Sequence, residues 1–142
     1  MATGTFQIPY NAKTKLLTAD VDLSAVNWKV ALVTSSNNLA VGTSDLYSNM
    51  TGEVATGNGY TQGGTSCTLG VSGSGTTKTA TMADVQFSAS GGSITARYAV
   101  WYDSVSSIIL GWVLLDSLDA DVVISNGAQL TLKATNGLFT LT

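Results

Sequence analysis

The chain has 142 residues, which is enough for one domain to bury a core without disulfides or bound metal. Only 11% of its residues are charged, against about a quarter in a typical soluble domain, and its polar character comes from 20 Thr, 16 Ser and 15 Gly. The net charge is −3 and the six basic residues are scattered, which argues against a nucleic-acid-binding surface. Such a composition fits a protein packed in an assembly or exposed outside a cell, and it also fits a plain β-rich domain.

Several kinds of chemistry are missing from the sequence. The chain contains no histidine, so histidine-based catalytic triads and histidine metal sites are excluded. Cys67 is the only cysteine and is expected to be a small buried side chain, so the fold does not require an oxidising compartment. We expect no signal peptide, no membrane span and no cofactor, and the product is expected to be made in a cytoplasm.

The first residues predict an arm followed by a helix. Residues 1–9 are expected to form an extended N-terminal arm. After Pro9, the run YNAKTKLL predicts the only helix of the chain, with Tyr10, Leu16 and Leu17 forming one stripe.

The next part combines a clear strand with a long irregular segment. Residues 28–34 (WKVALVT) alternate and predict a strand with Trp28, Val30 and Leu32 facing inward. Residues 35–64 show weak periodicity, and a segment of this length is expected to pack across one side of the domain. Leu46 and Tyr47 are its predicted anchors.

The rest of the chain predicts short strands joined by turns. Strands are expected over 66–71, 78–88, 94–115 as a hairpin, 120–125, 128–134 and 138–141, with glycine-rich turns between them. The pair Asn126-Gly127 is typical of a two-residue hairpin, so the strands on either side of it are expected to pair.

The 94–115 hairpin is apolar on both faces. Simple alternation places Tyr98, Val100 and Tyr102 on one side and Trp101 on the other. A strand in a small antiparallel domain usually keeps one face in water, so this hairpin needs cover on both sides. The cover comes either from the same chain or from a partner. A partner is expected around Trp101, and the chain itself over Ile109, Val113 and Leu115.

These elements predict an all-β fold, namely an antiparallel β-sandwich of jelly-roll type with one short N-terminal helix. Residues 1–9 form the arm, and residues 10–142 form a single sandwich domain. Few charged residues protect the sheet edges, which favours pairing between chains.

The carboxylates give no specific sign of a reaction. Asp116, Asp119 and Asp121 surround one turn and are candidates for an ion, although a solvated turn is the simpler interpretation. A glycosidase would require Glu53 to face Asp84 or Asp103, which the sequence does not indicate.

Two further patterns have ordinary structural interpretations. The glycines of residues 57–64 lack the lysine and the strand-to-helix context of a phosphate loop. Tyr47, Tyr60, Trp101 and Trp112 are candidates for stacking on sugars, but aromatic residues in strands more often belong to a core or a subunit interface.

Several segments together resemble a group of small virion structural proteins of tailed bacteriophages. They are YNAKTKLL, NWKVALVTSS, Glu53 with GNGYTQGG, ITARYAVWYD, the following GW and the late NG turn, and they span most of residues 10–141. The resemblance implies a capsid decoration or cement protein, a small all-β unit that sits on the outside of the phage head.

This resemblance implies binding and stabilisation rather than catalysis. The implied partners are the major capsid protein and further copies of the chain, as a homodimer or homotrimer, with no nucleic acid and no membrane. The candidate interface side chains are Phe6, Ile8, Tyr10, Tyr47, Tyr60 and Trp101. A tail or fibre component and a carbohydrate-binding module remain alternatives, and the latter requires Trp101 or Tyr60 to be exposed.

Overall fold

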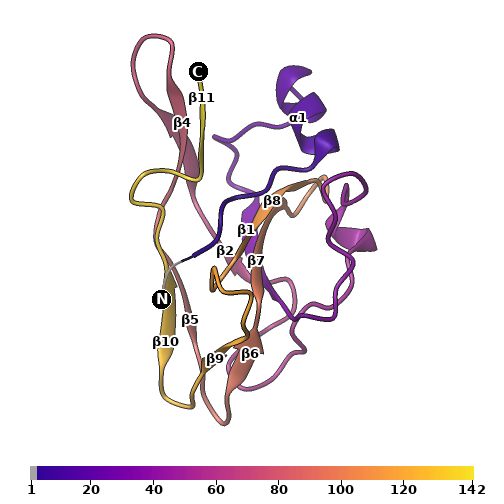
Figure 1. Ribbon diagram of the computed structural model, residues 1–142, viewed down its shortest axis with the longest axis vertical. Coiled ribbons are helices and arrows are strands. Elements are labelled where there is room, and N and C mark those ends of the chain that lie inside the picture. Colours follow the sequence, from indigo (N-terminus) through magenta and orange to yellow (C-terminus); the bar gives the residue numbers. More distant parts are fainter. Residues whose placement is uncertain (1–2) are drawn as a thin grey trace.

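The computed structural model describes residues 3–142, which form an antiparallel all-β sandwich with one short α-helix (Figure 1). The helices are α1 (Tyr10–Leu17) and the 3₁₀ turn η1 (Tyr47–Asn49). The strands are β1 (Trp28–Val33), β2 (Thr65–Ser66), β3 (Leu69–Ser72), β4 (Lys78–Met82), β5 (Val85–Ser88), β6 (Ile94–Ala96), β7 (Tyr98–Asp103), β8 (Ile109–Leu114), β9 (Val122–Ile124), β10 (Gln129–Leu132) and β11 (Phe139–Leu141). The all-β prediction is confirmed, and jelly-roll connectivity stays a prediction.

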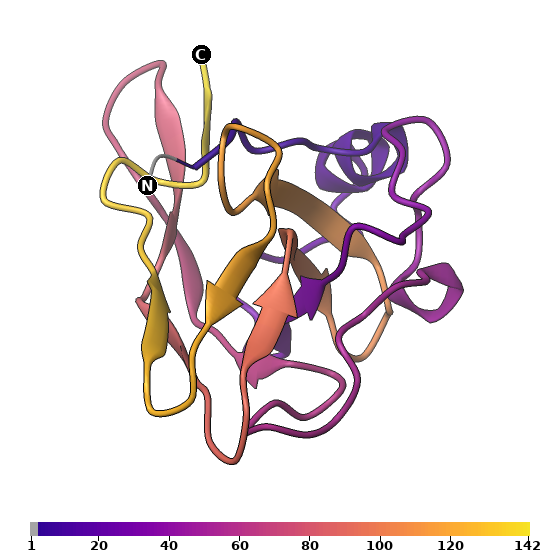
Figure 2. The same ribbon diagram turned by 60° about the horizontal axis from the view of Figure 1, so that its bottom comes forward.

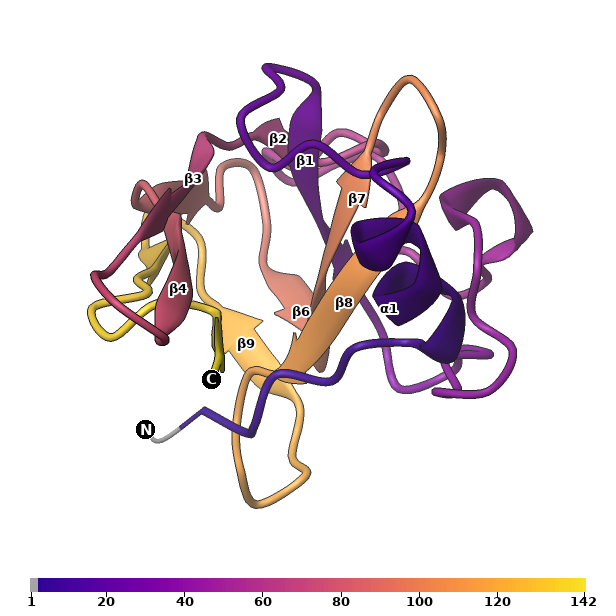
Figure 3. The same ribbon diagram turned by 90° about the horizontal axis from the view of Figure 1, so that it is seen from above.

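The central sheet has the order β2-β1-β7-β8. A second strand layer, which contains the sheet β11-β4-β3 and the pair β10-β5, shares the main core with the central sheet. In the remaining pair, β6-β9, β6 leads through Arg97 into β7. Figure 3 shows β3 and β4 on one side of the central sheet and α1 with the segment after β1 on the other. The apolar hairpin is therefore the middle layer of the molecule.

Both faces of the hairpin are covered within the one chain. Trp101 and Leu110 belong to the main core, between the central sheet and the second strand layer. On the opposite face, Val100 and Ile109 pack with side chains from residues 39–50. The predicted packing of residues 35–64 across one side is thus confirmed for Ile109, whereas Val113 and Leu115 lie against the main core.

Simple alternation along the hairpin fails at two places. Arg97 interrupts the first strand between β6 and β7, so Ile94 lies on the same side as Trp101 rather than opposite it. Trp101 of β7 pairs with Gly111 of β8, and the next residue, Tyr102, pairs with Ile109. This register leaves one extra residue in β8, at a β-bulge. A bulge of this kind reverses the faces of all residues beyond it.

The predicted hairpin around Asn126-Gly127 is wrong. Gly127 does form a turn with φ +81°, but β9 pairs with β6 and β10 pairs with β5, so the two flanking strands separate (Figure 2). Asn126 is not among the described residues with positive φ, so the turn is not the type in which both central residues have positive φ.

Two local predictions also differ from the structure. The expected strand over 78–88 is divided at Ala83 and Asp84 into β4 and β5, which join different sheets. In α1 the predicted stripe is wrong, because Tyr10 is 64% exposed and Leu17 is 88% exposed, whereas Ala12 is buried and Leu16 packs against the main core.

Candidate functional site

A cluster around Glu53 ties the long segment after β1 to the central sheet. Glu53 is the only glutamate of the chain and is half-buried. Its carboxylate accepts hydrogen bonds from the hydroxyls of Tyr47 and Tyr60 and from the backbone N–H of Gly63. The Tyr60 and Gly63 bonds to Oε1 both measure 2.7 Å. We call Tyr47, Glu53, Tyr60, Gly63 and Tyr102 the Glu53 clamp.

The clamp continues into the backbone of the sheet. The Tyr60 hydroxyl accepts a bond of 3.0 Å from the N–H of Leu32 in β1. The Tyr102 hydroxyl, from β7, donates to the carbonyl of Gly63 at 2.7 Å. The rings of Tyr47 and Tyr102 are stacked with centroids 3.8 Å apart. One hydrogen-bond network centred on the Glu53 carboxylate thus links residues 47–63 to both β1 and β7.

Glycines allow the segment to approach β1 closely. Gly64 has φ +68°, and a Cβ at this position would lie 1.8 Å from the carbonyl oxygen of Val30. Only glycine fits there without moving the backbone. The glycines near Tyr60 are therefore explained by contact with the sheet, and the motif of residues 57–64 is part of the clamp rather than a phosphate loop.

The clamp holds its phenols in the protonated form. Burial and the bonds to the Glu53 carboxylate raise the pKa of Tyr47 and of Tyr60 far above the usual value. Both oxygens of the Glu53 carboxylate accept hydrogen bonds from the clamp, so this side chain acts as an acceptor that holds residues 47–63 in place. Burial also raises the pKa of the Cys67 thiol to about 12, which leaves it protonated and unreactive at neutral pH.

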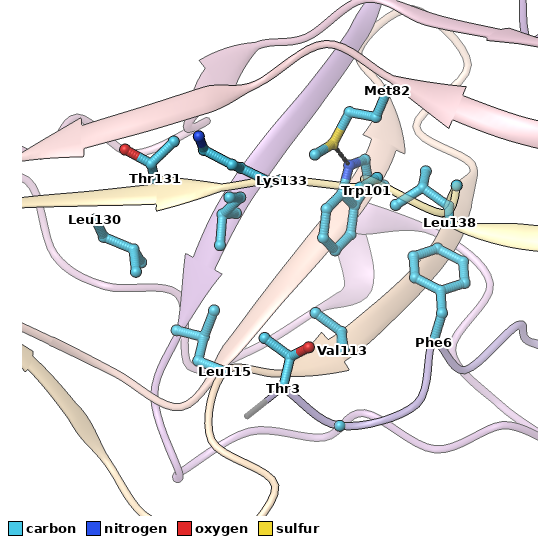
Figure 4. A pocket seen from close by; sticks show the side chains of 14 residues that line it. Thr3, Phe6, Met82, Trp101, Val113, Leu115, Leu130, Thr131, Lys133 and Leu138 are labelled. Atoms are coloured by element: carbon cyan, nitrogen blue, oxygen red, sulfur yellow. Dashed lines mark hydrogen bonds between the residues drawn. The ribbon is translucent and has the colours of Figure 1, made fainter. Parts of the chain in front are cut away.

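A groove lies beside the N-terminal arm and has a volume of about 350 Å³. Figure 4 shows Phe6, Trp101 and Val113 along it, with Leu130 and Leu138 at its two ends. The indole N–H of Trp101 donates to the sulfur of Met82 at 3.0 Å. We call this hollow the arm groove.

The predicted interface side chains fall into separate environments. Trp101 and Tyr60 are 2% and 3% exposed, so both are buried in the core of their own chain and neither offers a face for stacking on a sugar. Tyr47 is half-buried in the Glu53 clamp. Phe6 and Ile8 are half-buried, and Tyr10 alone is exposed.

The other carboxylates are engaged in local contacts. Arg97 binds Asp121 at 2.8 Å and Asp119 at 3.5 Å, and the Asp116 side chain accepts a bond from the N–H of Leu118. Within residues 3–142 no three His, Cys, Asp or Glu side chains are placed to hold a metal ion.

The carboxylates considered as a glycosidase pair have separate partners. Asp84 lies 3.6 Å from Lys133, and Asp103 accepts bonds from the β7–β8 turn, so neither joins Glu53 in its clamp.

Large apolar side chains remain exposed at the ends of several loops. Val26 is 91% exposed and Val105 is 76% exposed. Their neighbours Asn27 and Ser104 are joined by two hydrogen bonds, from the N–H and the hydroxyl of Ser104 to the carbonyl of Asn27. These bonds bring the two valines to the same end of the molecule, and we call them the valine pair.

No protein-family model, curated protein or solved structure matches this chain. Among the described helices, none has the length and apolar character needed to span a membrane.

Sequence reasoning missed the role of the clamp. It selected Tyr47 as an anchor of residues 35–64 and Tyr47 and Tyr60 as interface aromatics, and it considered Glu53 only as half of a glycosidase pair and as part of a resemblance. A usable signal was present, since one glutamate stands between two tyrosines in a segment that is otherwise almost free of charge.

Proposed function

We propose that this protein is a non-enzymatic structural component of a tailed-phage virion that binds the outside of the assembled head and stabilises it. The observation that carries the proposal is the combination of a closed interior with an ion-poor surface that displays exposed aliphatic side chains. The resemblance of several segments to phage virion proteins supports the same conclusion.

The interior offers no free polar group for chemistry. Within the described part of the chain, every buried side-chain nitrogen and oxygen has a hydrogen-bond partner. The strongest polar cluster, the Glu53 clamp, uses its groups to hold a loop against β1 and β7. This arrangement supports a role in binding rather than catalysis.

The surface suits contact with a large partner. Leu17, Val26 and Leu118 each expose more than four-fifths of their area, on a chain in which only 11% of residues are charged. On a surface with few charged residues, a partner can cover exposed aliphatic side chains at a small desolvation cost, because few ions are buried with them.

A protein of this kind stabilises a shell by mass action. If it binds the assembled lattice and not the free capsid subunit, occupancy of its sites favours the assembled state. The partners are then the major capsid protein and neighbouring copies of this chain, and the location is the capsid exterior.

The proposal is tested by reconstituting heads. Stripped heads and free major capsid protein are each incubated with the purified chain, and the bound chain is measured after sedimentation. We expect saturable binding to heads and none to free subunits, together with a higher temperature of head disruption. Equal binding to free capsid subunits, or no effect on head stability, would contradict the proposal.

A further inference from the structure

The N-terminal arm is held as an extra strand on the free edge of β8. The N–H of Gly4 donates to the carbonyl of Leu114 at 2.9 Å. Gln7 and Trp112 exchange two backbone bonds of 2.8 and 3.0 Å. Between these bonds Phe6 points inward and anchors the arm.

The Phe6 ring packs against Trp101, Phe139 and Gly111, which we call the Phe6 seat. Its ring meets the edge of Trp101 with centroids 5.3 Å apart and stacks on Phe139 at 5.8 Å. A Cβ on Gly111 would lie 2.4 Å from both the Phe6 ring and the carbonyl oxygen of Gln7. The bare backbone at Gly111 therefore makes room for this arm, and every copy of the chain carries the same seat.

The packing around the seated arm is incomplete. The arm groove of about 350 Å³ lies on the Phe6 side. A second hollow of about 510 Å³ lies on the other side, next to Thr5, Gln7 and Trp112. An arm flanked by two surface hollows has fewer packing neighbours than a core strand, so it is expected to open more readily.

The hinge is short and favours an extended arm. Only Ile8 and Pro9 separate the last bond on β8 from the N–H of Tyr10, which is bound to the carbonyl of Val41. Pro9 is buried with φ −59° and ψ 154°, and a residue before proline is restricted to extended conformations. Ile8 therefore stays extended when the arm is released, and the six residues 3–8 reach about 20 Å when extended.

From these features we infer that the arm is an exchangeable strand, which in the oligomer lies on β8 of a second copy of this chain. Phe6 then enters the seat formed by Trp101 and Phe139 of that copy. The arm makes the same contacts with its own β8 and with the β8 of a second copy. The equilibrium between these two states therefore depends on the hinge and on the local concentration of copies.

The inference rests on the proposed function only for the high local concentration on a shell. Exchange itself is a property of the purified chain, so it can be tested without a virion. Failure of the exchange test leaves head binding to be judged by its own assay.

A disulfide trap distinguishes exchange from folding back. In a Cys67→Ala background, one variant carries Gly4→Cys and another carries Leu114→Cys. The second chain of each mixture carries a mass tag, and the two chains are mixed, unfolded and refolded together, then oxidised and separated on a non-reducing gel. We expect a covalent heterodimer whose mass is the sum of the untagged and tagged chains, which separates it from the homodimers of either variant. The control is the mixture of Gly4→Cys with Val105→Cys, because Val105 lies in the β7–β8 turn, before β8 begins. It is expected to give a heterodimer yield at least tenfold lower.

The variant that carries both Gly4→Cys and Leu114→Cys reports on arm seating in general. If it closes a disulfide within single chains while the mixture yields no heterodimer above the Val105→Cys control, the arm is not exchanged and the inference is overturned. Should Gly4→Cys disturb the fold, Thr5→Cys carries the same test, because Thr5 lines the second hollow with Leu114 and already has a Cβ.

The seat for Phe6 provides a matched pair of controls. Phe6→Ala added to the Gly4→Cys chain is expected to lower the heterodimer yield at least tenfold, because the anchoring ring is lost. Gln7→Ala, which changes an exposed side chain and keeps the backbone bonds, is expected to leave the yield within twofold. Equal yields from the two variants would contradict the inference, because a cross-link that does not depend on Phe6 does not come from an arm seated on a second copy.

Discussion

Glu53→Gln is the substitution that most directly tests the Glu53 clamp. The carboxylate accepts three hydrogen bonds, and a bond to a charged group contributes about 1.5–3 kcal/mol. Glutamine keeps one acceptor oxygen, but it removes the charge and places an N–H₂ group against one donor. Because Glu53 is only half-buried, water replaces part of the loss. We therefore expect the free energy of unfolding to fall by about 2 kcal/mol for Glu53→Gln and by about 3–4 kcal/mol for Glu53→Ala.

Urea denaturation measures this change. With a slope of about 2 kcal/mol per molar urea, Glu53→Gln is expected to lower the midpoint by about 1 M without changing the slope. Asp84→Asn is the matched control, since this carboxylate is exposed and makes a single contact of 3.6 Å with Lys133. It is expected to change stability by less than about 0.5 kcal/mol. A Glu53→Gln effect as small as that of the control would refute the role given to the clamp.

Three further predictions concern pH, the arm and the surface. The unfolded phenols of Tyr47 and Tyr60 ionise near pH 10 while the folded ones stay protonated, so stability is expected to fall as pH rises above about 10, with each phenol contributing roughly 1.4 kcal/mol per pH unit. Tyr60→Phe is expected to remove the Tyr60 share of that slope in denaturation curves from pH 9 to 11. Gly111→Ala is expected to displace the arm, to lower the free energy of unfolding by about 1–3 kcal/mol and to speed hydrogen exchange of the arm amides. Unchanged exchange rates of these amides would contradict the close fit of the arm at Gly111. The double change Val26→Thr with Val105→Thr is expected to weaken head binding at least tenfold without altering the fold, whereas Val71→Thr, on an exposed strand position, is expected to leave binding unchanged.

Strand content and the need for cover followed from the sequence because they depend on local composition. The runs around Trp101 and Trp28 are apolar and β-branched, and each becomes a strand of the central sheet. Cover on both faces of the hairpin was required by its apolar pattern, and the structure provides it from one chain.

The partner of each strand and the sheet face on which each side chain lies were not predictable in the same way. Both depend on contacts between residues far apart in the sequence. The bulge opposite Trp101 and the break at Arg97 each reverse a face, and neither leaves a mark that alternation can detect. The turn at Gly127 was found, but the partners of its flanking strands are set by β5 and β6, far along the chain.

The candidate site was predicted only in part. Tyr47 and Tyr60 were selected for their aromatic rings, yet their hydroxyls make the bonds that matter to the fold. The convergence of these two hydroxyls on Glu53 depends on how residues 35–64 fold over β1, which local patterns do not specify. Phe6 was selected as part of a free arm, and the structure adds its seat beside Trp101.

Cryo-electron microscopy of virions that carry this protein is the decisive measurement of its place on the head. We expect ordered density on the outside of the head that fits the sandwich with α1 and repeats at equivalent positions of the capsid lattice. Density for this fold confined to the tail or a fibre, or a head surface without it, would contradict the proposed role.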